Sequence, residues 1–83
     1  MSQKWLRCSL LPGMFSDEMV VVIKTLSGEE SSFFVPRQQV RGEVGKIGQV
    51  MVWTFEQGAH PWAVIPNDSQ SMIPVDESEF AAA

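Results

Sequence analysis

The chain has 83 residues, of which 45% are hydrophobic and 19% are charged, with a formal net charge of −4 and a pI of about 4.7. This length predicts one domain with a modest core, and the composition is too apolar for a disordered chain. The negative charge argues against nucleic-acid binding, which would need a local basic patch. No stretch approaches the roughly 20 apolar residues that a membrane span needs.

A single cysteine, Cys8, excludes an internal disulfide framework and every zinc motif built from several cysteines. The apolar run over residues 8–11 is too short for a secretory signal, so we expect a cytoplasmic protein. One histidine, one cysteine and scattered carboxylates do not supply a ligand set, so neither a metal nor a cofactor is expected.

Residues 4–10 alternate with the period of a half-buried strand, and Leu6, Cys8 and Leu10 share the side that we expect to face the core. A buried cysteine in an apolar row is usually inert, so we do not expect a reactive thiol. Pro12 and Gly13 follow, and they predict a type II turn with the glycine at positive φ.

Residues 19–36 hold two β-rich runs separated by a short polar segment, which predicts a hairpin. A turn centred on Ser27 and Gly28 places Val21 opposite Phe34. Both faces of this two-stranded ribbon are then apolar. Each face must therefore pack against another part of the protein. The fold class that follows is all-β, a five- to six-stranded antiparallel small barrel with one short helical or 3₁₀ turn.

Pro36 has no N–H to donate and therefore ends the third strand, and a helical or 3₁₀ turn is predicted to begin there. The segment that follows is the only basic cluster of the chain. Its three basic residues are candidates for a small anion-binding patch, with a solvated loop as the alternative, and they are Arg37, Arg41 and Lys46. Three glycines in the same segment lack the Lys-Ser/Thr ending of a P-loop, so we interpret it as a flexible connection.

A second hairpin is predicted from residues 49–55 and 62–66, joined across a turn at residues 57–60. If Glu56 lies opposite Pro61, both faces are again apolar. One of them collects the large side chains of Met51, Trp53, Phe55, Trp62 and Val64. Either both faces are buried, or this aromatic face is partly exposed and contacts another molecule.

The C-terminal part begins with a polar turn at residues 67–70 and continues as a short edge strand over 71–75 that contains Pro74. Residues 76–80 are predicted to form one helical turn. We expect a single domain over residues 1–80, and interpret 81–83 as a disordered tail and a cloning remnant.

Aromatic side chains are the strongest candidates for a binding site. Trp5, Trp53, Phe55 and Trp62, with His60 at the rim, would form a shelf for a peptide, a base or a small ring, and the alternative is that they form the core. The four predicted binding residues of this shelf are Trp53, Phe55, His60 and Trp62. His60 has no evident nucleophile or orienting carboxylate beside it, so no catalytic arrangement can be argued. We therefore do not expect an enzyme.

The number and spacing of the strands, with a last strand reading Met72-Ile73-Pro74-Val75, resemble an SH3-like small barrel. Peptide-binding SH3 domains use a tyrosine-rich groove, and this chain has no tyrosine. The tripeptide Ala59-His60-Pro61 is similar to one in the plasmid-borne, trimethoprim-resistant dihydrofolate reductases, small barrels that act as tetramers around a shared pore. The Val-Gln-Ile-Tyr segment of those enzymes is absent, because Ser71-Met72-Ile73-Pro74 stands there.

The function expected from the sequence is that of a non-catalytic binding module that acts through the aromatic surface on a protein partner or on itself, as in a homodimer. One alternative is a small-molecule binder or enzyme whose site forms at a subunit interface of a homo-oligomer. Another is a weak binder of single-stranded nucleic acid that combines the aromatic residues with the basic cluster.

Overall fold

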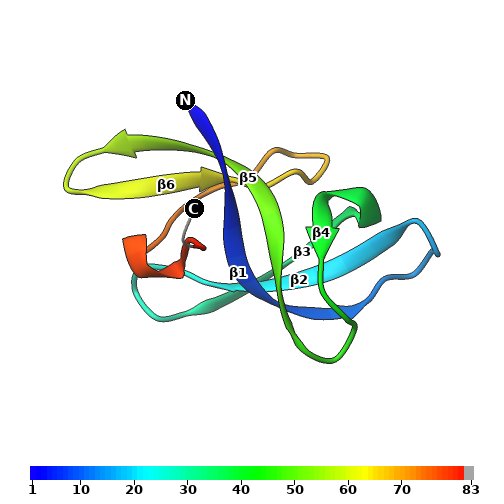
Figure 1. Ribbon diagram of the computed structural model, residues 1–83. Coiled ribbons are helices and arrows are strands. Elements are labelled where there is room, and N and C mark those ends of the chain that lie inside the picture. Colours follow the sequence, from blue (N-terminus) through cyan, green and yellow to red (C-terminus); the bar gives the residue numbers. More distant parts are fainter. Residues whose placement is uncertain (82–83) are drawn as a thin grey trace.

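The computed structural model describes residues 1–81 and shows one curled antiparallel sheet that forms a half-barrel (Figure 1). The strands are β1 (Ser2–Pro12), β2 (Glu18–Lys24), β3 (Glu30–Pro36), β4 (Val40–Arg41), β5 (Ile47–Gln57), β6 (His60–Val64) and β7 (Met72–Pro74). Two 3₁₀ turns, η1 (Arg37–Gln39) and η2 (Glu77–Glu79), are the only helical segments among the described residues. The predicted all-β antiparallel class is confirmed.

The strands follow one another across the sheet in the order β3-β2-β1-β5-β6-β7, and β4 pairs with β5 beside this path. The two longest strands, β1 and β5, pair with each other and cross the middle of the molecule (Figure 1). Curling brings the loop between β2 and β3 to β7, where the Leu26 N–H donates to the Pro74 carbonyl at 2.9 Å. The sheet therefore encloses its own core.

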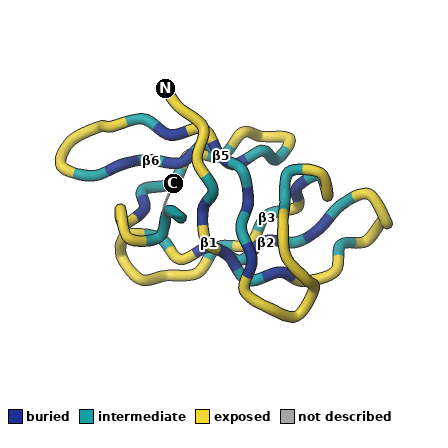
Figure 2. Tube along the Cα trace, in the orientation of Figure 1, coloured by how far each residue is buried: buried dark blue, intermediate teal, exposed yellow. Residues whose placement is uncertain are grey.

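The core lies on the concave face of the sheet. It is built from alternate residues of the strands, and Figure 2 shows how burial changes along them. Its fully buried members with the largest side chains include Leu6, Leu10, Ile23 and Ile65. The predicted inward row of β1 is confirmed, because Leu6, Cys8 and Leu10 are all buried. Phe33, Val40, Ile73 and Phe80 pack against this core and are partly buried.

The predicted register of the first hairpin is wrong by one residue. Val21 pairs with Phe33 rather than with Phe34. Phe33 therefore packs on the core, whereas Phe34 points outward and is 51% exposed.

The cause of this shift is the length of the loop. The Thr25 N–H donates to the Glu29 carbonyl at 2.8 Å, which leaves three residues, 26–28, between the paired ends. Gly28 has a φ of +93°, as in three-residue hairpin loops that end in a left-handed residue. Compared with a two-residue loop, this three-residue loop shifts the pairing of the two strands by one residue. The shift exchanges the two phenylalanines between the faces of the sheet.

The predicted type II turn at Pro12 and Gly13 is also wrong. Strand β1 continues through Pro12, which pairs with Met19, and Gly13 is not among the residues with positive φ. A longer loop over residues 13–17 makes the connection instead. Gly13 is needed for space, because a Cβ atom there would lie 2.6 Å from Cγ of Glu18.

The second hairpin has the predicted register, with Glu56 opposite Pro61. Its loop has two residues, Gly58 and Ala59, and Gly58 has a φ of +76°, as expected at the first position of a type II′ turn. The 3₁₀ turn predicted to begin at Pro36 is confirmed by η1.

Beyond β7, the chain returns to β1. Leu6 and Phe80 form an isolated bridge, and the Ala81 N–H donates to the Trp5 carbonyl at 2.9 Å. Residues 82 and 83, to which most of the expected tail belongs, lie outside the described residues. The single domain over residues 1–80 stays a prediction.

Candidate binding surface

The convex side of β1, β5, β6 and β7 carries a set of large apolar side chains, which we call the outer aromatic face. Its members occupy the outward positions between the core residues of each strand, and they are Trp5, Met51, Trp53, Phe55, Trp62, Val64, Met72 and Pro74. Strand register brings them side by side, since Phe55 lies opposite Trp62 and Trp53 opposite Val64. Of the two alternatives left by the sequence, partial exposure of this face is the one observed.

Ring stacking organises one end of the outer aromatic face. Phe55 and Trp62 stack with centroids 6.4 Å apart and planes inclined by 16°. His60 lies 6.1 Å from Trp62 with its ring tilted by 34°, so three of the four predicted binding residues are in one cluster. The fourth, Trp53, is 46% exposed, and Met72 is 60% exposed.

Two polar atoms of this cluster are buried without a hydrogen-bond partner among the described residues. They are Nε1 of Trp62 and Nδ1 of His60. Buried polar groups in folded proteins are almost always hydrogen-bonded, and an unpaired one costs about 1–3 kcal/mol. The aromatic cluster is therefore short of hydrogen-bond partners in the isolated chain.

Arginine side chains border the outer aromatic face on β4 and β1. Arg41, Gln49 and Arg7 lie next to one another across β4, β5 and β1. The guanidinium of Arg41 stacks over the Trp5 ring, 4.1 Å from its centroid, and its Nε donates to Oε1 of Gln49. A cation held over an aromatic ring gains about 0.5–1 kcal/mol at exposed sites.

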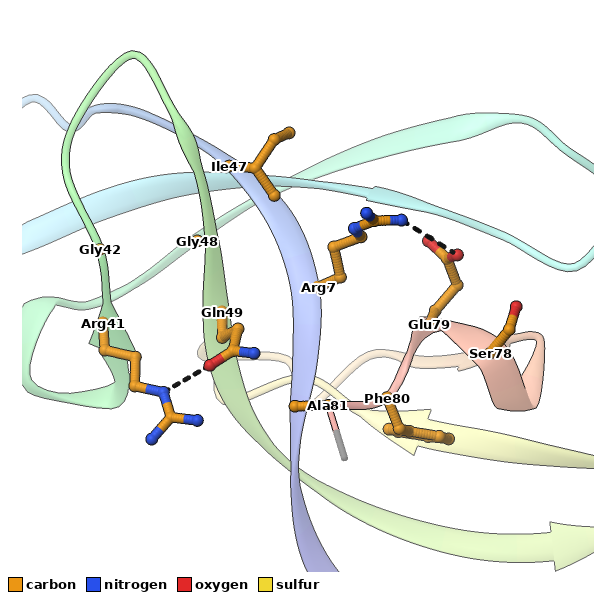
Figure 3. Close-up of a pocket in the computed structure, with 10 residues that line it drawn as sticks. All are labelled: Arg7, Arg41, Gly42, Ile47, Gly48, Gln49, Ser78, Glu79, Phe80 and Ala81. Atoms are coloured by element: carbon orange, nitrogen blue, oxygen red, sulfur yellow. Dashed lines mark hydrogen bonds and ion pairs between the residues drawn. The ribbon is translucent and has the colours of Figure 1, made fainter. Parts of the chain in front are cut away.

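Arg41, Gln49 and Arg7 line a cavity of about 490 Å³ (Figure 3). Arg41 and Arg7 flank Gln49 and turn away from each other, because Arg7 faces Glu79, with Nη1 4.0 Å from Oε2 (Figure 3). The cavity thus combines two positive groups with one negative group. An exposed ion pair of this length contributes little to stability.

The three residues of the predicted anion patch each have a separate partner. Nε of Arg37 donates to the Ser16 carbonyl at 2.8 Å, and Nζ of Lys46 lies 3.0 Å from Oε2 of Glu43. Of the three, Arg41 lines the cavity of Figure 3. The anion-binding patch stays a prediction. Sequence reasoning missed Arg7 as a lining residue of the cavity, although the alternation along β1 already placed its side chain on the outward side.

A second opening, which we call the amide groove, has a volume of about 300 Å³ beside Trp53. Four residues with amide side chains line it together with apolar residues of β5, of β6 and of the two positions after β6, and they are Gln3, Gln39, Asn67 and Gln70. Sequence reasoning missed this groove because its amides come from separate segments of the chain.

Residues 1–81 contain no group of three or more His, Cys, Asp or Glu side chains arranged to hold a metal ion. Within the same residues, no helix has the length and apolar character needed to cross a membrane. Cys8 lies on the core face, where burial raises the pKa of its thiol to about 12. A thiol with such a pKa is protonated at neutral pH and is a poor nucleophile.

Comparison with known proteins gives no match, since no family model, no curated protein and no solved structure is significantly similar to this chain. The architecture described above is that of a small all-β protein with a curled antiparallel sheet.

Proposed function

We propose that this chain is an SH3-like small barrel that acts as a non-catalytic interaction module and binds a protein surface through the outer aromatic face. The observation that carries the proposal is the position of Trp53 and Met72. Both side chains lie on this face, and they are 46% and 60% exposed. Contiguous apolar surface of this kind, rimmed by charged residues, is typical of protein interaction sites.

The composition of the face supports this function. Tryptophan and methionine are enriched at protein interfaces, and arginine is enriched beside them. Trp53 offers a large rigid side chain, and Arg41 is already held over Trp5, so little conformational freedom would be lost on binding.

The first experiment measures the oligomeric state by light scattering coupled to size exclusion, over a range of protein concentrations. The second places a photo-crosslinking amino acid at Met72 and identifies what it captures in an extract of the source cells. Trp53→Ala combined with Trp62→Ala should abolish the self-association or the capture. Phe34→Ala is the matched control, because Phe34 is about as exposed as Trp53 but lies on β3, outside the outer aromatic face.

Unchanged self-association and unchanged capture in the folded double variant would refute the proposal. A closed oligomer that buries His60 around a solvent-filled pore would instead favour a small-molecule site at a subunit interface. Binding of single-stranded DNA that weakens steeply with salt would favour a nucleic-acid function.

A further inference from the structure

The amide groove exists because one edge of β5 is incompletely paired. β4 pairs with β5 as far as Val50, and β6 begins its pairing at Trp53. Met51 and Val52 lie between these two pairings, and both line the groove. Their opposite edge is paired with β1, so the opening is fixed by the strands that surround it.

The lining of the groove is neutral. Besides Met51, Val52, Trp53, Val64, Ile65 and Pro66, it consists of four residues with amide side chains, and no charged residue contributes to it. Gln3 lies opposite Trp53 on β1, Gln39 ends η1, and Asn67 and Gln70 belong to the turn that follows β6.

Three of these amides have free hydrogen-bonding capacity. Within residues 1–81, the side chains of Gln3, Gln39 and Gln70 make no hydrogen bond. Each amide offers two N–H donors and one carbonyl acceptor. Asn67 is held in place, since Nδ2 donates to Oγ of Ser71 at 3.0 Å and Oδ1 accepts from the Ser71 N–H at 2.9 Å.

Gln70 is held in an unfavourable backbone conformation. It has a φ of +50° and is the only non-glycine residue with positive φ among the described residues. The left-handed conformation costs a residue with a Cβ atom about 1–2 kcal/mol, and glycine would avoid this cost. Strain of this kind is concentrated at functional sites. The glutamine brings to the groove an amide that a glycine would not supply.

From these observations we propose that the amide groove binds a neutral saccharide. The exposed indole of Trp53 provides a flat apolar surface, on which the C–H face of a pyranose ring can pack. The surrounding amides both donate and accept, which matches hydroxyl groups, since these also do both. The absence of lining charges and the net charge of −4 disfavour ligands that carry phosphate or carboxylate groups.

The test is an NMR titration of the ¹⁵N-labelled chain with maltohexaose, cellohexaose, xylohexaose and chitotetraose. We expect at least one of them to shift the Trp53 indole N–H and the side-chain amide signals of Gln39 and Gln70, with a dissociation constant in the millimolar range. Gln39→Ala and Gln70→Gly should each weaken binding about tenfold, as the loss of one hydrogen bond predicts.

Met72→Ala is the matched control, because Met72 is exposed on the outer aromatic face but does not line the groove, and this variant should bind saccharide normally. The proposal is overturned if no saccharide shifts these signals, or if adenosine or oligo-dT shifts them more strongly than any saccharide. The groove shares Met51, Trp53 and Val64 with the outer aromatic face. Gln39 and Gln70 are not part of that face, so variants at these two positions test saccharide binding without changing the surface proposed for partner binding.

Discussion

Gly48 of β5 lies directly against Leu10 of β1, since a Cβ atom at position 48 would stand 2.5 Å from Cδ1 of Leu10 and 2.6 Å from the Arg41 carbonyl oxygen. Gly48→Ala must therefore displace a fully buried leucine and the backbone of β4. We expect a loss of about 1–3 kcal/mol in the free energy of unfolding, as for other overpacked cores. Urea denaturation measures this loss.

The control for Gly48 is Gly28→Asn. Gly28 has a φ of +93°, which strains any residue with a Cβ atom, but nothing lies within 4 Å of a Cβ atom there. This variant should therefore lose about 1 kcal/mol through backbone strain alone, less than Gly48→Ala. Equal losses in the two variants would show that the contact with Leu10 is not what requires a glycine.

The register of the first hairpin predicts different effects at two neighbouring phenylalanines. Phe33 packs on the core and Phe34 is 51% exposed. Phe33→Ala should cost about 3 kcal/mol, and Phe34→Ala should cost less than about 1 kcal/mol. Denaturant titration of both variants checks the difference, and a larger loss at Phe34 would mean that the hairpin has the alternative register.

Cys8 should be unreactive in the folded chain, because burial raises its pKa from 9.0 to about 12. A thiol reagent such as dithionitrobenzoate is expected to modify it at pH 8 only when urea unfolds the protein. Rapid modification without urea would contradict the burial of this thiol.

The same thiol makes stability depend on alkaline pH. Its pKa is higher in the folded than in the unfolded state, so the folded state retains the proton between pH 9.0 and about 12, and stability falls as the pH rises through this range. Cys8→Ala removes this contribution, so its stability should fall less steeply over the same range. If the free energy of unfolding fell equally steeply with pH in the parent chain and in Cys8→Ala, the raised pKa of Cys8 would be contradicted.

Asp76 caps η2 through Ser78. Its Oδ1 accepts from the Ser78 hydroxyl at 2.7 Å and from the Ser78 N–H at 2.9 Å, and these bonds lower the pKa of the carboxyl group. Because the pKa of Asp76 is lower in the folded than in the unfolded state, its ionised carboxylate stabilises the fold at pH values above the unfolded pKa. This stabilisation is lost as the pH falls through the lower pKa of the folded state. Ser78→Ala should raise the pKa of Asp76 toward 3.8, which carboxyl ¹³C NMR can follow. An unchanged pKa would assign the shift to the backbone bond.

The parts of the fold that could be predicted are those set by neighbours in the sequence. Alternation fixed the inward row of β1, and the short turn at Gly58 fixed the register of the second hairpin. The first hairpin has a longer polar segment in which a two-residue and a three-residue loop both fit, so the pattern alone did not decide between Phe33 and Phe34.

The candidate sites show the same limit. The members of the aromatic cluster could be named from the sequence, but the exposure of Trp53 depends on which side of the sheet encloses the core. The amide groove was out of reach, because Gln3, Gln39 and Gln70 are brought together by a gap between β4 and β6, and no spacing in the sequence records this gap.

The central place of β1 has a consequence for how the protein is made. During synthesis β1 leaves the ribosome well before β5, and it can pair with β2 while its other edge still lacks a partner. An unpaired apolar edge is a template for aggregation, and pairing between distant segments is slow to form. The nascent chain is therefore most vulnerable in the interval before Gln57 emerges, and slower translation would lengthen this exposure.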